Sequence, residues 1–400
     1  MSTCRLPPAG AWSRTTRARP RWPRPTWTAG RRSCIDPAPG TRPRSPLNAG
    51  PEPVSLPPRA PRWLPGGHLQ TIWPALVGRR RLAGAVRYRR ERWATPDGDF
   101  VDVDFALANP PAAGAEARPA AEAADVTPTA LGSPLERRLL VMFHGLEGSS
   151  ASHYAIAFAI EALARGWDFA LPHFRGCSGE LNRAPRAYHS GDFEEVGWML
   201  ARLRARAGTP VLAVGVSLGG NALLRWAAES GAEAAACTAA LAAVCAPVDL
   251  SASGHALGQG LNHHVYARMF LRTMKPKALA KWAQHPGLFD RERVARARSL
   301  HAFDDAFTAP VHGFAGADDY WARASSAPHL ARIRVPALAL NARNDPFVPP
   351  SSLPRPGVVG PCVELWQPSH GGHVGFAAGA FPGELGRLPA AVCDWLAARA

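Results

Sequence analysis

One serine of this chain lies in a setting that can activate a hydroxyl group for nucleophilic attack. Residues 215–219 read GVSLG, after an apolar run at 210–214 and before a helix-compatible run of small residues at 220–228. A strand, a tight turn with serine at its tip and a helix together form a nucleophile elbow. Glycines permit the sharp turn, and the start of the helix places positive partial charge nearby. The pattern predicts Ser217 as a nucleophile.

A serine needs a base to take its proton and an acid to orient that base. After Ser217, the chain offers Asp345 shortly after an apolar run at 335–340, and His373 shortly after another at 363–366. If these runs are parallel strands, both side chains follow carboxyl ends, where such sheets bind ligands. The order Ser, acid, His is that of doubly wound hydrolases. We therefore expect Asp345 to orient His373, and His373 to be the base.

Alternatives exist for both partners. Asp345 precedes a proline and could simply form a turn, whereas Asp318 and Asp319 are less favoured because they fall in a predicted cap. The glycines between His370 and His373 let the loop bend towards the serine, which favours His373 as the base and leaves His370 to line the pocket. His-x-x-His is a known metal pair, but no third ligand has suitable spacing. We therefore expect neither a metal nor another cofactor.

An ester-cleaving serine also needs two donors for the oxyanion of the tetrahedral intermediate. The backbone N–H of Leu218 is one candidate. The other is the N–H of Leu146, in the glycine-containing loop 144–148 that follows an apolar run at 139–143. His144 is better suited to brace this loop than to react. We expect three further residues at the substrate site: His144, Gly145 and His370.

These candidates must be positioned by an alternation of strands and helices. Apolar runs predict strands at 139–143, 167–171, 211–214, 239–245, 335–340 and 363–366, and periodicity predicts helices at 152–165, 193–207 and 388–398. This alternation indicates an α/β fold with a mostly parallel, doubly wound sheet covered on both faces. Residues 87–94 and 100–105 read as an N-terminal antiparallel hairpin around a turn at 95–99. The helical, aromatic stretch 250–330 is predicted to be a cap insertion.

Composition divides the chain unevenly. Of 400 residues, 46% are hydrophobic, and the formal net charge is +15. Ten arginines and one acid fall within residues 1–50. We interpret residues 1–56 as a disordered, solvated Pro/Arg-rich tail rather than a nucleic-acid site, although a tether to RNA or anionic lipid stays open. Residues 109–134 are predicted to be a flexible insertion in a hydrolase domain spanning 57–400.

The seven cysteines are scattered and show no C-x-x-C spacing. This argues against a disulfide framework and for a reducing compartment, the cytoplasm. Cys237 and Cys245 fall in apolar runs and are interpreted as buried spectators. The sequence shows neither a signal peptide nor an apolar stretch of transmembrane length, which leaves peripheral membrane contact open. It does not indicate an oligomeric state.

Seven segments together resemble the α/β-hydrolase superfamily, and within it the YheT-like branch, which includes eukaryotic abhydrolase-domain proteins. They are 65–71 (PGGHLQT), 95–100 (TPDGDF), 144–150 (HGLEGSS), 174–180 (FRGCSGE), 188–191 (YHSG), 215–221 (GVSLGGN) and 371–376 (GGHVGF). The likeness covers about residues 57–400. Asn344 stands where the family usually has a first aspartate, but Asp345 keeps the acid next to the proline. Arg175 and Glu180 are interpreted as a pair near the pocket rim.

The resemblance implies carboxylic-ester hydrolysis, with Ser217, Asp345 and His373 in the matching positions. The sequence thus predicts a serine hydrolase that works through an acyl-enzyme. The aromatic residues of the cap suggest a small-molecule or lipid substrate with an apolar acyl chain, such as a medium-chain ester or an acylglycerol. A non-catalytic ligand-binding protein on a hydrolase fold is the alternative, because a fold does not fix a function.

Overall fold

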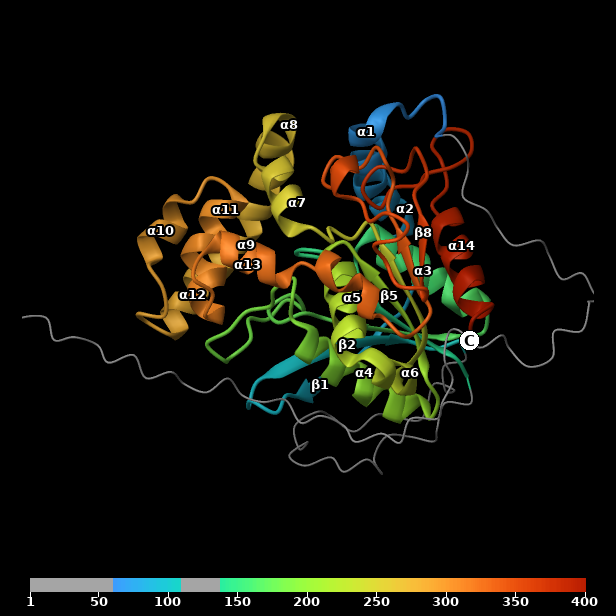
Figure 1. Cartoon of the computed structure of the whole chain (residues 1–400), viewed down its shortest axis with the longest axis horizontal. Coiled ribbons are helices and arrows are strands. Elements are labelled where there is room, and N and C mark those ends of the chain that lie inside the picture. Colours follow the sequence, from blue (N-terminus) through green and yellow to red (C-terminus); the bar gives the residue numbers. More distant parts are fainter. Residues whose placement is uncertain (1–59, 109–136) are drawn as a thin grey trace, which may run out of the picture.

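A twisted sheet of eight strands runs through the part of the chain that the computed structural model describes, residues 60–108 and 137–400 (Figure 1). The predicted tail (1–56) and insertion (109–134) lie outside the described residues, the tail wholly before residue 60. The strand order is β1-β2-β4-β3-β5-β6-β7-β8. The strands are β1 (Arg89–Ala94), β2 (Phe100–Ala106), β3 (Leu139–Phe143), β4 (Asp168–Pro172), β5 (Val211–Val216), β6 (Thr238–Val244), β7 (Ala337–Leu340) and β8 (Val363–Trp366).

Strands β3 to β8 are mutually parallel, whereas β1 and β2 form an antiparallel hairpin whose second strand pairs antiparallel with β4. The predicted fold class and the N-terminal hairpin are therefore confirmed. Parallel strands end at a common edge, so the residues that follow β3, β5, β6, β7 and β8 are brought together there.

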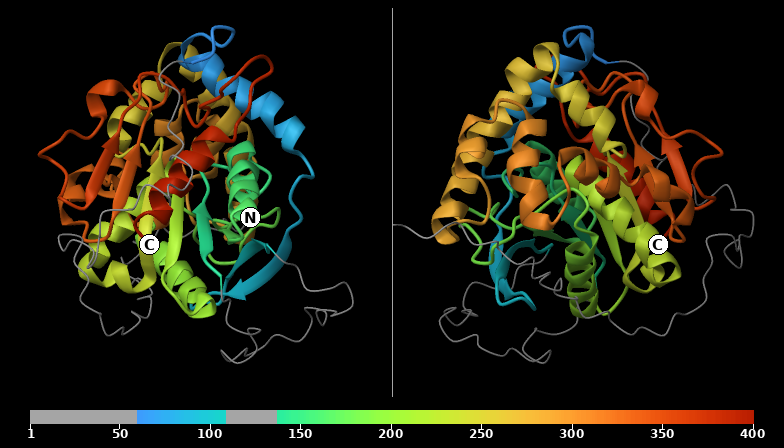
Figure 2. Two further views of the ribbon diagram at one scale, coloured as in Figure 1. Left: turned by 90° about the vertical axis from the view of Figure 1, so that its right-hand side faces the viewer. Right: turned by 60° about the vertical axis from the view of Figure 1, so that its left-hand side comes forward.

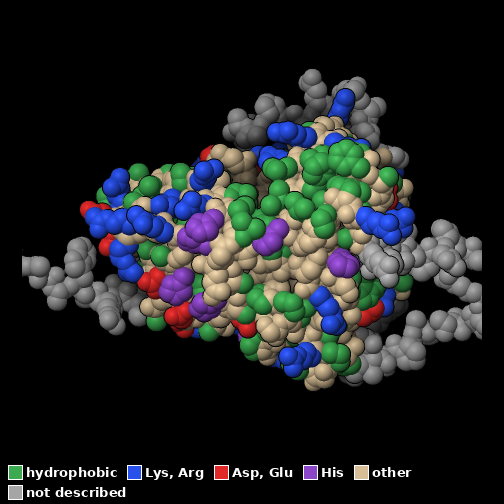
Figure 3. Space-filling model, turned by 90° about the horizontal axis from the view of Figure 1, so that it is seen from above, with side chains coloured by type: hydrophobic (Ala, Val, Ile, Leu, Met, Phe, Trp, Pro, Cys, Tyr) green, Lys and Arg blue, Asp and Glu red, His purple; other side chains and the backbone are tan. Residues whose placement is uncertain are grey.

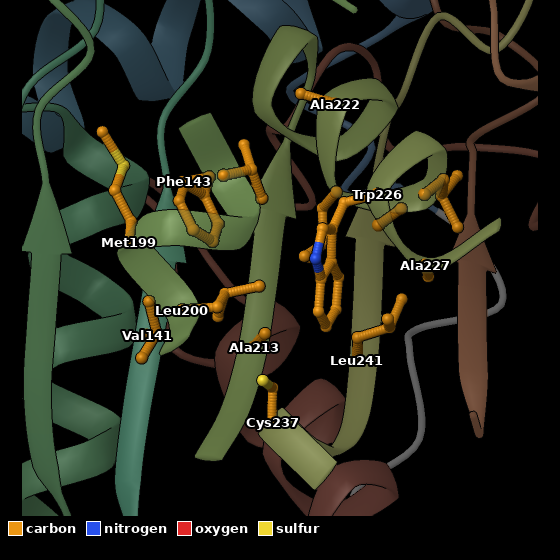
Figure 4. Close-up of a cluster of buried hydrophobic side chains, with 14 of the residues drawn as sticks. Val141, Phe143, Met199, Leu200, Ala213, Ala222, Trp226, Ala227, Cys237 and Leu241 are labelled. Carbon is orange, nitrogen blue, oxygen red and sulfur yellow. The ribbon is translucent and has the colours of Figure 1, made fainter. Parts of the chain in front are cut away.

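Helices cover both faces of the sheet, as the continuous apolar strands require (Figure 2). On one face α4 (Phe193–Ala207) and α5 (Leu218–Ser230) bury Leu200 and Trp226 against β3, β5 and β6, beside α6 (Ala234–Cys237) (Figure 4). On the other face α3 (His153–Ala164) and α14 (Arg387–Ala397) bury Phe158 and Trp395. Apolar side chains thus cover both faces of the sheet. Polar residues that could react are therefore expected at its carboxyl edge.

Two helical segments lie above that edge. The first precedes the hairpin: α1 (Gly66–Trp73), η2 (Pro74–Gly78) and α2 (Arg79–Leu82). The second lies between β6 and β7 and packs around its own apolar cluster, which includes Phe289, Phe303 and Phe307. Its elements are α7 (Leu250–Leu257), α8 (Gly260–Asn262), η6 (His263–Ala267), α9 (Arg268–Gln284), α10 (Arg291–Arg296), α11 (Leu300–Phe303), η7 (Asp304–Thr308), α12 (Ala309–His312), α13 (Ala317–Ala324) and η8 (Ala327–Arg332). Short helices η5 (Gly231–Glu233) and η9 (Pro350–Ser352) complete the described set.

A buried arginine joins the hairpin turn to the loop after β4. The Arg175 guanidinium contacts the carboxylates of Asp99 and Glu195, each at 2.6 Å, and that of Asp97 at 2.9 Å. The predicted pairing of Arg175 with Glu180 is wrong, because Glu180 instead pairs with Arg92 at 2.7 Å. Three acids from the turn and α4 surround the arginine, so the turn motif at 95–99 serves to hold this loop.

Four cysteines are buried free thiols, namely Cys177, Cys237, Cys245 and Cys393, whereas Cys362 is disulfide-bonded. The sequence argued against a disulfide framework, and among the described cysteines Cys362 alone is disulfide-bonded. Among the described residues, no helix is long and apolar enough to cross a membrane.

Replacing Arg175 with Met is expected to lower the free energy of unfolding by about 3–5 kcal/mol, because buried carboxylates lose their counter-charge. Urea denaturation measures this loss. The matched control is Arg183→Met, an exposed neighbour whose loss is expected to cost under about 0.5 kcal/mol. Equal losses in both variants would contradict the assigned role.

The same network predicts how stability depends on pH. Burial alone would raise the pKa of Asp99, but hydrogen bonds from Asn182 and from two backbone N–H groups, with the Arg175 charge, lower it to about 2 from 3.8. The folded state thus binds this proton less tightly than the unfolded chain, so the contribution is present above about pH 3.8 and is lost as the pH falls towards 2. Arg175→Met should therefore lose less stability than the wild type across that interval.

Candidate active site

Ser217 lies in a strained turn at the carboxyl end of β5. Its backbone has φ 53° and ψ −120°, a conformation that residues other than glycine rarely adopt, and it immediately precedes α5. The neighbouring glycines are required by contact. A Cβ on Gly219 would lie 2.4 Å from the carbonyl oxygen of Phe143, and one on Gly215 would lie 2.5 Å from the carbonyl oxygen of Gly219. Close packing of the backbone on both sides thus leaves Ser217 projecting from the end of the strand.

The imidazole of His373 lies between the serine and a carboxylate. Its Nε2 is 2.9 Å from the Ser217 hydroxyl oxygen, and its Nδ1 is 2.8 Å from Oδ2 of Asp345. A carboxylate only accepts hydrogen bonds, so Nδ1 carries the proton and Nε2 is free to accept one from the serine. The Asp345 side chain is fully buried and also accepts a hydrogen bond from the backbone N–H of Phe347. Ser217, Asp345 and His373 are therefore brought together from three strand ends.

The loop after β3 approaches the serine through its backbone. A Cβ on Gly145 would lie 3.2 Å from the Cβ of Ser217, so only a residue without a side chain fits comfortably. Leu146 and Leu218 both line the cavity beside the serine. As the first residue of α5, Leu218 has a backbone N–H without a carbonyl partner in the helix.

His144 braces this loop from within. It is fully buried, accepts a hydrogen bond from the backbone N–H of Phe174 at 3.1 Å, and its Nδ1 lies 2.8 Å from the carbonyl oxygen of Gly145. Burial, helped by the neighbouring His173, lowers the pKa of His144 to about 3, so the ring is neutral near pH 7. His144 thus lies behind the cavity wall. His370, for its part, is exposed and is not among the cavity-lining residues.

Two side chains from other elements hold the far end of the loop. The Tyr188 hydroxyl donates to the Glu147 carboxylate at 2.8 Å and accepts from the Glu147 backbone N–H at 3.0 Å. Lys277 of α9 pairs with the same carboxylate at 2.9 Å. Glu147 has φ 56°, and these contacts hold it in that conformation.

Helix α1 positions the histidine loop from more than 300 residues away in the chain. The amide oxygen of Gln70 accepts hydrogen bonds from the Gly371 backbone N–H and the Asn344 side chain, each at 2.9 Å. The Thr71 hydroxyl accepts one from the backbone N–H of His373 at 2.9 Å. A Cβ on Gly375 would lie 1.8 Å from the carbonyl oxygen of Gln70, so the loop and the helix are in backbone contact.

Asn344, the departure from the family pattern, belongs to the same connection. Its Nδ2 donates to Gln70, and its Oδ1 accepts from the backbone N–H of Gly372 at 3.0 Å. This position therefore uses both a hydrogen-bond donor and an acceptor. The amide supplies both, whereas an ionised carboxylate has no donor. Asn344 links the Asp345 loop, the His373 loop and α1.

Cys245 joins the acid and histidine loops from the end of β6. Its sulfur accepts a hydrogen bond from the backbone N–H of Val374 at 3.3 Å, and it lies with the reactive atoms of Asp345 and His373 inside a cluster 4.8 Å across. Burial raises the pKa of the Cys245 thiol well above its usual value, and Asp345 raises it further. Cys245 is buried as expected, and it contacts both the acid and the histidine loops.

Ser217 and His373 open onto an apolar cavity, here called the catalytic cavity, with about 700 Å³ of space including its mouth. Most of its wall comes from the helices between β6 and β7, among them Leu257, Phe270, Met274 and Trp321. A more polar side cavity adjoins it, since Leu146, Leu218 and Asp304 line both. The side cavity also contains Glu147, Lys277 and Lys281.

A family model described as alpha/beta hydrolase fold matches residues 138–380. The chain belongs to this family. It is also 38% identical over 332 residues to the Escherichia coli K12 protein named "Putative esterase YheT", a match covering 82% of this chain and 89% of that protein. The predicted resemblance to the YheT-like branch is thereby confirmed.

Two eukaryotic relatives share less sequence identity with this chain. The chain is 29% identical over 303 residues to "Phospholipase ABHD3" of Mus musculus, covering 74% of this chain and 68% of that protein. It is 27% identical over 257 residues to "Monoacylglycerol lipase" of Saccharomyces cerevisiae, covering 62% of this chain and 56% of that protein.

Sequence reasoning missed the roles of Gln70, Thr71 and Cys245. The segment 65–71 carries part of the family resemblance, but nothing local in it indicates a contact with the histidine loop. The available signal is the adjacent polar pair Gln70 and Thr71 between the apolar residues Leu69 and Ile72. These two side chains are buried although polar, which requires hydrogen-bond partners.

Gln70→Ala is expected to lower kcat for ester hydrolysis about tenfold or more, because the histidine loop loses its fixed position. KM should change little, since Gln70 does not line the catalytic cavity. Steady-state kinetics with a soluble nitrophenyl ester separate the two constants. Leu69→Ala, on the exposed side of the same helix, is the matched control and should behave as the wild type.

Cys245→Ala is expected to lower kcat about tenfold with KM unchanged, because Val374 loses its hydrogen-bond acceptor beside the acid–histidine pair. The matched control is Cys237→Ala, a buried thiol on α6 that should affect stability but not kcat. Thermal unfolding of both variants identifies losses of activity that come from instability alone. A normal kcat in a folded Cys245→Ala protein would refute a positioning role.

Proposed function

We propose that this chain is a serine hydrolase of carboxylic esters in which Ser217 is the nucleophile, His373 the general base and acid, and Asp345 the residue that orients His373. One observation carries the proposal: the imidazole lies 2.9 Å from the serine hydroxyl and 2.8 Å from the carboxylate. Relatives named as an esterase, a phospholipase and a monoacylglycerol lipase support the same class of reaction.

In the first half of the proposed reaction, Nε2 of His373 takes the hydroxyl proton while the serine oxygen bonds to the ester carbonyl carbon. The carbonyl π electrons move onto its oxygen, and the backbone N–H groups of Leu146 and Leu218 donate to that oxyanion. Removing one such donor typically costs about 3 kcal/mol of transition-state stabilisation. The negative charge of Asp345 stabilises the imidazolium formed.

The intermediate then collapses and the bond to the leaving alcohol breaks. His373 gives its proton from Nε2 to the alcohol oxygen, which leaves an acyl group on Ser217 and a neutral imidazole. Water repeats the cycle: His373 takes its proton, hydroxide adds to the acyl carbon, and the proton returns to the serine oxygen as the acid departs. The chain's own residues suffice for each proton transfer.

The proposed substrates are medium-chain acyl esters or acylglycerols. The apolar wall of the catalytic cavity suits an acyl chain, because each buried CH₂ group favours binding by about 0.8 kcal/mol. The polar side cavity meets it beside Leu146 and Leu218, where the ester carbonyl would lie, and suits the alcohol portion. Hydrolysis of nitrophenyl esters from acetyl to dodecanoyl tests this, and equal kcat/KM for acetyl and octanoyl esters would contradict it.

Ser217→Ala is expected to lower kcat at least about ten-thousandfold and to abolish labelling by a fluorophosphonate probe. Ser190→Ala, a second serine at the cavity wall, is the matched control and should still be labelled. Failure of the wild type to react with the probe or with any ester in the series would favour the ligand-binding alternative.

A further inference from the structure

Large hydrophobic side chains are exposed on the two helical segments above the carboxyl edge of the sheet. Leu69 and Leu76, on α1 and η2, are 49% and 61% exposed. Leu261, Val265 and Met269, from α8 to α9, are 52%, 37% and 51% exposed. Residues spaced by four or seven positions share one side of a helix, so each set forms an outward apolar stripe.

The two stripes belong to neighbouring segments at one end of the molecule. His68 of α1 and Tyr266 of η6 approach within 3.2 Å, and their rings stack at 5.9 Å. In Figures 1 and 2 the α1 segment and the α7–α8 region rise to the same end of the molecule. Phe381, 66% exposed, packs beside α1 against Trp63 and Trp73. We call the surface formed by Leu69, Leu76, Leu261, Val265, Met269 and Phe381 the apical face.

Positive charge accompanies these side chains. Residues 60–90, which contain α1 to α2, and residues 250–289, which contain α7 to α9, have no aspartate or glutamate; the acids of the second helical segment begin at Asp290. Their exposed cations include Arg80, Arg268 and Arg272. Figure 3 looks down on this end: hydrophobic and basic side chains occupy much of the view, and acidic ones lie towards its margins. A face that is both apolar and basic matches an anionic lipid surface.

We propose that the apical face binds the surface of a phospholipid bilayer that carries negatively charged headgroups. Its leucines, methionine and phenylalanine enter the headgroup boundary, while the arginines contact the anionic groups. A second copy of the chain is the less suitable occupant, because a two-fold interface would bring like charges together. The inference rests on the proposed function in one respect: it makes membrane-dissolved acyl lipids the substrates of the catalytic cavity.

The cavity lies directly beneath this face. The same segment that exposes Val265 and Met269 turns Phe270 and Met274 into the catalytic cavity. The rings of Tyr266 and Phe270 pack on Phe347 at 4.6 and 6.2 Å, and the Phe347 ring lies 4.2 Å from that of His373. A bilayer on the apical face would therefore be close to the reacting groups.

Vesicle co-sedimentation tests the proposal with the full-length Ser217→Ala protein, so that no lipid is cleaved. We expect binding to mixed phosphatidylcholine and phosphatidylglycerol vesicles that is stronger than to phosphatidylcholine alone and weakens with added salt. Combining Leu76→Asn, Leu261→Asn and Met269→Asn should lower the partition coefficient roughly tenfold. Combining Arg268→Gln with Arg272→Gln should lower the preference for phosphatidylglycerol by roughly tenfold.

The matched control is Val358→Asn. Val358 is 61% exposed in the loop that leads into the amino end of β8, away from the carboxyl edge of the sheet. It should bind as the parent does. All variants keep residues 1–59, so the arginines of that segment contribute equally. Unchanged binding by the apolar triple variant would overturn the proposal, as would a dimer that this variant converts to monomer.

Turnover of soluble nitrophenyl butyrate, measured with Ser217 restored, separates this inference from the proposed function. Normal turnover with lost vesicle binding in the triple variant is the expected result. Vesicle binding by a protein that cleaves no ester would leave the apical face supported and refute the catalytic proposal.

Discussion

The arrangement at the strand ends depends on holding one imidazole in line with two partners that are distant in sequence. His373 must be within hydrogen-bond distance of Ser217 and Asp345 at once, although each follows a different strand. A parallel sheet brings the three strand ends to a common edge but does not fix the loops beyond them. Helix α1 does so through Gln70 and Thr71, by hydrogen bonds to loop backbone that has no strand partner.

Backbone proximity explains most of the glycines at this edge. The elbow packs against the carbonyl groups after β3, and the histidine loop packs against the carbonyl of Gln70, at distances that leave no room for a Cβ. The strained conformations of Ser217 and Cys245 occur where such contacts surround the chain from several sides. Strain of this kind persists only when the surrounding structure holds it. The same close backbone packing therefore makes the fold rigid and fixes the geometry of the site.

Buried polar groups connect the loops around the site to the rest of the fold. Arg175 fastens the loop after β4 to the hairpin turn and to α4, and Asn221 of α5 donates to the carbonyl oxygens of Ser190 and Ala324. Asn221 thereby connects α5, the helix that begins after Ser217, to the end of the helical segment that covers the cavity. The helical cover of the catalytic cavity is thus hydrogen-bonded directly to α5, which packs on the sheet.

The sequence by itself determined the strands, the parallel sheet, the hairpin and the family, because periodicity, glycine spacing and local motifs are short-range signals. It also singled out Ser217, Asp345 and His373, since the order of strand ends limits which side chains can meet. The tertiary structure alone decided the partners of Arg175, the contacts of Cys245 and the role of α1. Each of these depends on a contact between segments distant in the chain, and no local pattern encodes which buried polar group will meet which backbone N–H.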